Sequence, residues 1–359
     1  MADHPYKSLP DKAFWRRAVA RPKPQDVDPV GIFDLRITPA SKVATAGSCF
    51  AQHIARHLGK NGFSYYVAEP GHSIIPAQAR SRNNYGLFSA RYGNIYTARQ
   101  LLQLFQRATG TFVPLENAWQ PAPGICLDPF RPTTQPGGYI SETEMLRDRE
   151  QHLRSVRTMF ETLDVFVFTL GLTECWRSRE DGAVFPLCPG VEGGEFDPDR
   201  YEFYNQTVSD VIEDLRKFRD GLESVNKDAQ IVLTVSPVPL MATAAQGSHV
   251  LSATTYSKSV LRVAAETMRM SFPNVHYFPS YEIITGSFNR GSYYASDLRD
   301  VLERGVEHVM RVFMRHATGQ LAVSGSQEAN KKAPEESGFL ESAEHLIEVE
   351  CDEVALDKG

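Results

Sequence analysis

The sequence predicts an α/β protein with an open, flavodoxin-like parallel sheet and helices on both faces. Four short runs rich in Val, Ile, Phe and Thr do not alternate with polar residues, which is typical of strands covered on both sides. Segments with helical periodicity lie between and after these runs, so strand and helix alternate along the chain. The four predicted strands are KVATAG (42–47), VFVFTLG (165–171), QIVLTVSPV (230–238) and VHYFPSYEII (275–284).

The helical segments are placed by periodicity and by their end signals. One opens with Ser141 and has Glu144 three residues later, which is a capping-box pattern. The first predicted helix ends at Gly62, a residue type common just beyond a helix end. The predicted helices are 49–62, 141–163, 206–226, 256–272 and 296–316.

Composition narrows the class of protein. The 359 residues carry a net charge of −6 and a pI of about 6.0, which argues against general nucleic-acid binding. Hydrophobic residues make up 42% of the chain, yet no run of 18 apolar residues occurs, so no membrane-inserted helix is expected. The first 20 residues lack an apolar segment behind their charges, so we expect no secretory signal and a cytoplasmic location.

The chain is predicted to hold one large domain with additions. Residues 1–39 form an N-terminal extension, and residues 40–317 form the domain. Segment 64–140 is dense in Pro, Gly, Asn and aromatic residues, and we interpret it as an insertion or lid after the first βα unit. Residues 318–359 are predicted to be a disordered acidic tail, in which FLESAEHLIEVE (339–350) is a candidate docking segment for a partner.

Cysteine and histidine spacing gives no sign of a metal centre. The five cysteines are an odd number, are widely spaced and contain no CxxC, so neither a disulfide framework nor a zinc ribbon is expected. His53 and His57 form an i,i+4 pair, but HIARH lacks the glutamate of a HExxH motif. A metal-dependent hydrolase is therefore the weakest of the enzymatic hypotheses.

Gly47-Ser48-Cys49 stands where the first strand passes into the first helix. A thiol at a helix N-terminus has a lowered pKa, and the free N–H groups there can hold an oxyanion. On this interpretation Gly47 permits a sharp turn, Ser48 caps the helix and Cys49 is the nucleophile. The alternative is an ordinary capped turn in which Cys49 is a small buried side chain.

Several segments resemble one known family. GSCFA (47–51) is the signature for which the GSCFA family is named. Further matching segments follow in order: FTLGLTECW (168–176), LTVSPVPLMAT (233–243), TYSKSVLR (255–262) and YFPSYEII (277–284). The GSCFA family is in turn similar to the SGNH/GDSL hydrolases, whose flavodoxin-like sheet carries enzymes that cleave esters or transfer acyl groups.

The resemblance implies roles for individual residues. It places Cys49 at the nucleophile position, with its own backbone N–H as an oxyanion donor. Gly171 and Thr173 correspond to the block that supplies a further oxyanion donor, and the Thr173 hydroxyl would take that part. Glu174 would orient a base or bind a substrate hydroxyl; a plain polar strand end is the alternative.

The expected general base is missing from its usual place. The final SGNH block, Asp-x-x-His, corresponds to Asp297-Leu298-Arg299-Asp300, so Asp300 replaces the histidine. A carboxylate is a poor substitute because its pKa lies far below neutrality. Three accounts stay open: another histidine serves, the thiolate needs no base, or catalysis has been lost. The candidate histidines are His53, His72 and His249.

Other polar residues near strand ends are candidates for substrate binding. Ser236 lies near the end of the third predicted strand, where the chain passes into a proline-rich loop. Tyr256, Ser257 and Lys258 are predicted to open a helix, where they would offer an anion site; ordinary helix capping by the serine is the alternative. Polar groups of the insertion suit either binding or anchoring of the insertion through backbone carbonyls; these are Arg91, Tyr92, Asn94 and Arg131.

The leading functional prediction is an acyl-ester hydrolase or O-acyltransferase of SGNH-like type, a cysteine esterase or acetyltransferase. Its substrate would be a small molecule or glycan that carries a hydroxyl group. No cofactor is expected, although an acyl-CoA donor would be needed for some transfer reactions. The alternative is a non-catalytic ligand-binding protein that keeps an SGNH-like cleft, which the replacement by Asp300 favours.

Overall fold

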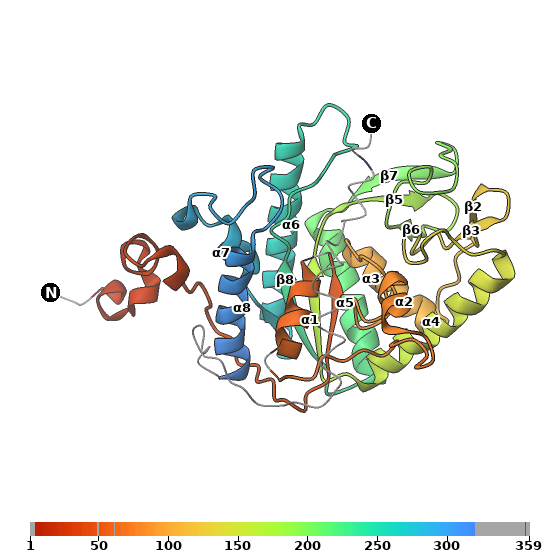
Figure 1. Ribbon diagram of the computed structural model, residues 1–359. Helices are drawn as coiled ribbons and strands as arrows, with labels where there is room; N and C mark the ends of the chain where they lie inside the picture. The colour runs from red at the N-terminus through yellow and green to blue at the C-terminus, as the bar shows by residue number, and fades with distance from the viewer. Residues whose placement is uncertain (1–3, 49, 61, 320–355, 357–359) are drawn as a thin grey trace.

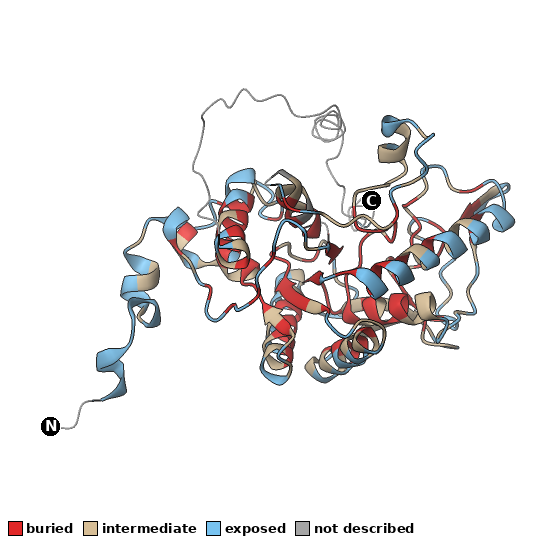
Figure 2. Cartoon of the chain, turned by 90° about the horizontal axis from the view of Figure 1, so that it is seen from below, coloured by how far each residue is buried: buried red, intermediate tan, exposed pale blue. Residues whose placement is uncertain are grey.

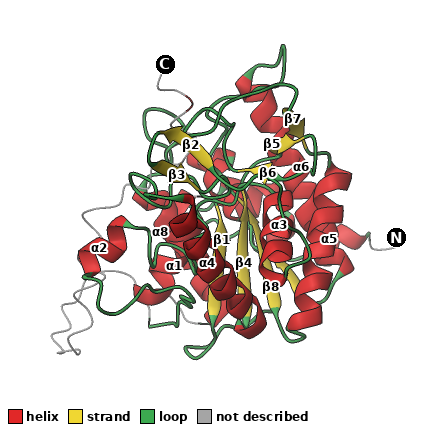
Figure 3. Ribbon diagram, turned by 90° about the vertical axis from the view of Figure 1, so that its right-hand side faces the viewer, coloured by secondary structure: helices red, strands yellow, loops and turns green. Residues whose placement is uncertain are grey.

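The computed structural model describes residues 4–48, 50–60, 62–319 and 356 (Figure 1). Four parallel strands form the central sheet in the order β1-β4-β8-β9. Figure 3 shows β1, β4 and β8 side by side in this order. Their bounds are β1 (Val43–Gly47), β4 (Val165–Leu170), β8 (Gln230–Val235) and β9 (Val275–Tyr277). A single parallel bridge joins Val43 to Tyr65 along the other edge of β1. The predicted parallel α/β architecture is confirmed.

Helices cover both faces of this sheet (Figures 1 and 2). Side chains alternate along each strand, so Phe166 and Phe168 face one core while Val165 and Val167 face the other. The first core is closed by α3 (Ala98–Thr109), α4 (Glu142–Thr162), α5 (Val208–Val225) and α6 (Val250–Ser271). The second core is closed by α1 (Ala51–Lys60), α7 (Ser280–Thr285) and α8 (Glu303–Thr318).

The predicted insertion, residues 64–140, has two parts. Helix α3 buries Leu101, Leu104 and Phe105 in the main core, so this part belongs to the helical layer. The rest holds α2 (Ala77–Arg82) and the pair β2 (Trp119–Ala122) and β3 (Ile125–Leu127). A second small sheet follows β4 and is made of β5 (Glu174–Ser178), β6 (Val184–Phe185) and β7 (Tyr201–Asn205). Both small sheets lie beyond the carboxyl ends of the central strands (Figure 3).

Three predicted boundaries were wrong by six or seven residues. The run 275–284 leaves the sheet after Tyr277, because Pro279 cannot donate to the ladder and α7 starts next. The last helix begins at Glu303 instead of residue 296, because the Asp297 carboxylate accepts the N–H groups of Arg299 and Asp300 and closes a turn. Helix α6 begins at Val250, six residues earlier than predicted.

The N-terminal extension joins the folded body. Four short helical turns come first: η1 (Pro5–Ser8), η2 (Asp11–Ala13), η3 (Arg16–Ala20) and η4 (Pro24–Asp26). Residues 27–37 then run along α8, where the Ile37 N–H donates to the Ala317 carbonyl at 2.7 Å. Val30 and Phe33 complete the second core. The predicted tail, 318–359, lies outside the described residues except for Thr318, Gly319 and Leu356. None of the described helices combines the length and apolarity needed to cross a bilayer.

Candidate functional site

The turn after β1 is tightly held against β4. Gly47 has φ +137°, and a Cβ atom there would lie 2.4 Å from the Thr169 carbonyl oxygen, so only glycine fits. The Ile95 N–H donates to the Gly47 carbonyl at 2.9 Å, and the Ser48 N–H donates to the Thr169 carbonyl at 3.3 Å. The next residue, Cys49, lies outside the described residues, so its role as nucleophile stays a prediction.

Ser48 does not cap α1 as predicted. The helix begins at Ala51, and the Ser48 carbonyl closes the turn before it by accepting the Ala51 N–H at 2.8 Å. The Ser48 hydroxyl is buried and forms no hydrogen bond with any described residue. Gln52 is only 4% exposed, and the oxygen and nitrogen of its side-chain amide also have no hydrogen-bond partner among the described residues. The Thr169 hydroxyl beside Gly47 is a third such group.

Buried polar atoms without partners are costly, at about 1–3 kcal/mol for each group. Ser48 and Gln52 lie within five residues of Gly47, and Thr169 pairs with it in the sheet. The adjacent His53 Nδ1 also lacks a partner, and the other buried atoms of this kind are scattered through the described structure. Most buried polar groups in folded proteins have partners, so a concentration at one place needs an explanation. One explanation is that these atoms are hydrogen-bonding groups for a bound molecule, because a ligand's polar groups would satisfy them.

A buried lysine reaches the same edge from α6. Lys258 is 1% exposed, and its Nζ donates to the Gly171 carbonyl at 2.7 Å, just beyond the end of β4. Its neighbour Ser257 accepts the Thr173 N–H at 3.0 Å. Because α6 begins at Val250, Tyr256 and Lys258 lie inside the helix, so the anion site predicted at a helix N-terminus was wrong.

Lys258 and Ser48 are attached to nearby points of the same strand end. Ser48 is held by the Thr169 carbonyl and Lys258 by the Gly171 carbonyl. Carbonyl oxygens two residues apart in extended chain lie about 7 Å from each other. A buried amine responds strongly to its surroundings and can act as a cation or as a base. The turn, the end of β4 and Lys258 are called the edge site below.

Comparison with known proteins assigns the chain to a family. Residues 42–313, well over half of the sequence, match the model of the GSCFA family. The chain belongs to the GSCFA family. The matched range contains the whole central sheet and the edge site. No curated protein matches the sequence.

Two predicted residues of this GSCFA protein are engaged with other parts of the chain. The Thr173 hydroxyl donates to Asn205 Oδ1 at 2.6 Å, so both hydrogen-bond donors of Thr173 are in use. An oxyanion could bind the hydroxyl only by displacing Asn205. Glu174 is half-buried and accepts the Thr243 hydroxyl at 2.7 Å; burial raises the pKa of its carboxyl above the ordinary value.

The candidate histidines of the GSCFA domain differ in burial. His53 packs against the ring of Phe50, and burial lowers its pKa to about 4, so it is neutral at neutral pH. His249 and His72 are exposed, and each ring accepts a nearby backbone N–H through Nδ1. The His57 ring bonds to the His53 carbonyl. Among the described residues, no three His, Cys, Asp or Glu side chains gather to hold a metal ion.

The segment expected to carry the base does reach the edge of the sheet. The Tyr294 hydroxyl donates to the Pro237 carbonyl at 2.8 Å, next to the end of β8. Ser236 is buried there, and its N–H donates to the Leu170 carbonyl at 2.8 Å. Asp297 and Asp300 follow on an exposed turn, so both carboxylates are in contact with water.

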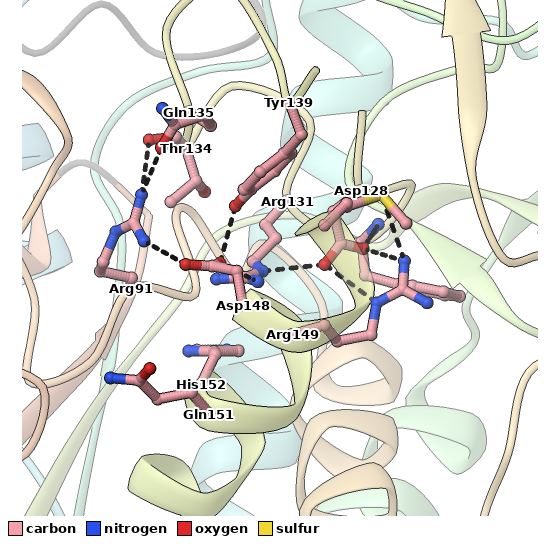
Figure 4. A network of polar contacts seen from close by, with 12 residues as sticks. Arg91, Asp128, Arg131, Thr134, Gln135, Tyr139, Asp148, Arg149, Gln151 and His152 are labelled. Atoms are coloured by element: carbon pink, nitrogen blue, oxygen red, sulfur yellow. Dashed lines mark hydrogen bonds and ion pairs between the residues drawn. The ribbon is translucent and has the colours of Figure 1, made fainter. Parts of the chain in front are cut away.

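Some polar groups of the insertion anchor it to the body of the protein, and others line a cavity. Arg91 is buried and pairs with Asp148 at 3.0 Å (Figure 4). It also donates to the Asn83 carbonyl at 2.8 Å, so it anchors the insertion. The Tyr92 hydroxyl donates to the Thr45 carbonyl in β1. Asn94 and Arg131 line a small cavity beside α3.

Helical periodicity could have predicted the burial of two titratable side chains, which was not foreseen from the sequence. Lys258 shares a face of α6 with Leu261 and Ala265, so it is a charge on an apolar face. His152 occupies the equivalent position on α4, between buried Met145 and Val156. A titratable residue at an apolar position of an amphipathic helix indicates a buried, specifically bonded group.

Proposed function

We propose that this GSCFA protein hydrolyses or transfers an acyl ester, and that Cys49 attacks the acyl carbonyl. The hydroxyl-bearing partner is a carbohydrate or similar small molecule. The observation that carries the proposal is the buried amine of Lys258 at the carbonyl of Gly171, about 7 Å along extended chain from the one that holds Ser48. The distant similarity to SGNH-type enzymes adds the reaction class.

Lys258 takes over the role of the missing histidine, which is to activate the nucleophile and to transfer the proton. Its positive charge at the edge site favours the thiolate form of a nearby cysteine. The thiolate attacks and forms the C–S bond, while N–H groups of the turn hold the oxyanion. The intermediate then loses the alkoxide, which takes a proton from the Lys258 ammonium, and a thioester remains. Asp300, on its exposed turn, has no part in this step.

The second half of the reaction restores the site. Water or an acceptor hydroxyl gives a proton to the neutral Lys258 amine and attacks the thioester carbonyl. The C–S bond breaks, and the thiolate and ammonium are recovered. Water as acceptor makes the protein an esterase, and a sugar hydroxyl makes it an O-acyltransferase. An acyl-CoA can serve as donor in the first half, since it is itself a thioester.

Alkylation kinetics test the activated thiolate. Iodoacetamide at pH 6 is expected to modify Cys49 at least about tenfold faster than Cys175 and Cys188. Those two are internal references, because burial raises the pKa of Cys175 to about 12 and that of Cys188 to about 11. K258M should slow the reaction of Cys49 to the reference rate, and K258R should keep most of it.

Activity measurements test the chemistry itself. C49A is expected to abolish hydrolysis of an activated acetyl ester, and K258M to lower kcat with little change in KM. Full activity of C49A, or alkylation of Cys49 no faster than that of the reference thiols, would refute the mechanism. K258M that keeps the wild-type kcat would remove Lys258 from it and leave Cys49 in place.

The second candidate function is ligand binding without catalysis. It is favoured by Asp300, which stands exposed where a histidine is expected. In that case the edge site binds its ligand through Ser48, Gln52 and Lys258, and no turnover occurs. Slow alkylation of Cys49 together with binding of a sugar or acyl compound that K258M weakens would select this function.

A further inference from the structure

A second polar site lies directly behind the turn, on the other side of residues 92–95. It is a partly open cavity of about 30 Å³ between α3, α4 and the loop after β3. Its wall includes Asn94, Gln103, Arg107, Phe130, Arg131 and His152. A polar cavity of this size has room for one or two water molecules or for a small ionic group. It is called the arginine cavity below.

Arg131 brings an unused donor to this cavity. It is 4% exposed, and its Nε and Nη2 pair with Asp128 at 2.8 Å and Asp148 at 2.6 Å (Figure 4). Its Nη1 is buried and has no hydrogen-bond partner among the described residues. A guanidinium donor left unpaired in a dry site is costly, so an acceptor is expected there.

Arg107 brings a whole guanidinium without a counter-ion. Its guanidinium forms no hydrogen bond or ion pair with the described part of the chain, and it lies 3.9 Å above the ring of Phe130. Burial, together with the charges of Arg149 and Arg131, lowers its pKa to about 9, and Asp128 opposes this only in part. The environment of Arg107 therefore has too much positive charge.

The charges of all residues around the arginine cavity also add up to an excess of positive charge. Around the cavity stand four arginines, Arg91, Arg107, Arg131 and Arg149, against three carboxylates, Glu69, Asp128 and Asp148. His152 adds no charge, because burial lowers its pKa and its neutral ring donates through Nδ1 to Glu69 at 2.7 Å. One positive charge stays uncompensated in a largely buried cluster. Such a charge requires a counter-ion.

We propose that the arginine cavity binds a small oxyanion, a phosphate or carboxylate group, between Arg107 and Arg131. The planar guanidinium fork is suited to both groups, since it can donate two parallel N–H bonds to their oxygens. The anion would take the free Nη1 donor of Arg131 and neutralise the excess charge. It is either a free ion or the acidic end of a larger molecule.

The position of the cavity couples it to the edge site. Asn94 and Ile95 form part of its wall, and the Ile95 N–H donates to the Gly47 carbonyl at 2.9 Å. An anion in the cavity therefore stabilises the segment that supports the turn from behind. This coupling does not depend on the chemistry at Cys49, because each residue in it belongs to the described structure.

Thermal unfolding of the full chain tests the proposal. The protein is dialysed into Tris-chloride buffer and titrated with inorganic phosphate, acetate or glucose 6-phosphate at constant ionic strength. We expect at least one of these to raise Tm by about 2–4 °C and to saturate. Phosphate alone identifies a free ion as ligand, and the sugar phosphate alone identifies the acidic end of a larger molecule. Calorimetric titration measures the affinity.

Two arginine variants make the test specific. R107M should weaken anion binding at least tenfold and remove the Tm shift, and without anion it should be no less stable than the wild type. R154M is the matched control, because Arg154 lies on exposed α4 surface and, among the described residues, pairs only with Glu150. An R107M protein that responds as the wild type does, or a wild type that responds to none of the three compounds, would overturn the proposal. Should R107M fail to fold, R107K takes its place, with weakened binding expected.

Discussion

Two buried polar regions meet behind the carboxyl edge of the sheet, and they are satisfied to different degrees. The first region is the network of arginines and carboxylates beside α4. Each of its three carboxylates, Glu69, Asp128 and Asp148, accepts hydrogen bonds from at least two donors. At the turn after β1, the polar side-chain atoms of Ser48 and Gln52 have no partner among the described residues. The network holds the insertion in place. The turn keeps unused hydrogen-bonding groups that a ligand could satisfy. Arg107 and the unpaired Nη1 donor of Arg131 offer a similar unused capacity in the neighbouring arginine cavity.

The largest expected effect comes from breaking the network. Asp128 is buried and pairs with Arg131 and Arg149, which hold the pKa of its carboxyl far below the ordinary value although burial alone would raise it. D128N should lower the free energy of unfolding by about 3–5 kcal/mol, because two guanidinium groups lose their counter-ion. Urea denaturation measures this loss. E150Q breaks an exposed pair with Arg154 and should cost less than about 1 kcal/mol. Equal losses would show that the network is not structural.

The next effect tests the backbone of the turn. G47A places a Cβ against Thr169 at a φ of +137°, and we expect a loss of about 2–3 kcal/mol or more. Gly59 in α1 is the matched control, because a Cβ there meets no atom within 4 Å. G59A should gain about 0.5–1 kcal/mol through helix propensity. If G47A is as stable as G59A, the turn is looser than described.

The third prediction concerns pH. Burial lowers the pKa of His53 from 6.5 to about 4, so between these values the unfolded chain binds a proton that the folded protein does not. This proton uptake by the unfolded chain costs nothing above pH 6.5 and lowers the stability of the folded protein as the pH falls toward 4, by about 3 kcal/mol in total. H53Q should flatten this slope in Tm measurements from pH 7 to 4.5. H72Q replaces an exposed ring and should leave the pH dependence of Tm unaltered.

The smallest effect compares two buried glutamines. Gln103 donates to the Gly182 carbonyl and accepts the Val184 N–H, each at 2.8 Å, whereas Gln52 has no described partner. Q103M should cost about 1–3 kcal/mol, because it leaves two backbone groups unpaired, while Q52M should be neutral or stabilising by up to about 1 kcal/mol. Chemical denaturation distinguishes the signs. A destabilised Q52M would mean that its amide is already satisfied in the folded protein.

The sequence was sufficient to predict the central sheet and its helical layers. Buried strands such as 165–170 are apolar except for a single threonine, and helices such as 142–162 carry a clear period and a capping serine. The small sheets were not predicted, since strands as short as Val184–Phe185 leave no pattern. Pro279 was a readable end signal within the last strand run, but the apolar residues around it concealed it.

The candidate site was predicted only in part. The turn at Gly47 and the strand ends at Gly171 and Ser236 do converge, because parallel strands end at one edge. The arginine network could not be predicted, because its pairs join distant positions, such as Glu69 and His152, which are 83 residues apart. Lys258 was named for the wrong reason, since its importance depends on its burial and not on a helix end.

Residues 27–37 lie outside the region that matches the family, yet they are part of the folded domain. The family match begins at residue 42, yet Val30, Phe33 and Ile37 cover apolar positions of α8. A shortened chain that starts at the match would leave that face open to water and prone to self-association. Recombinant work on this protein should therefore place its first residue before Val27, and the same check on α8 applies to relatives that are cut by alignment alone.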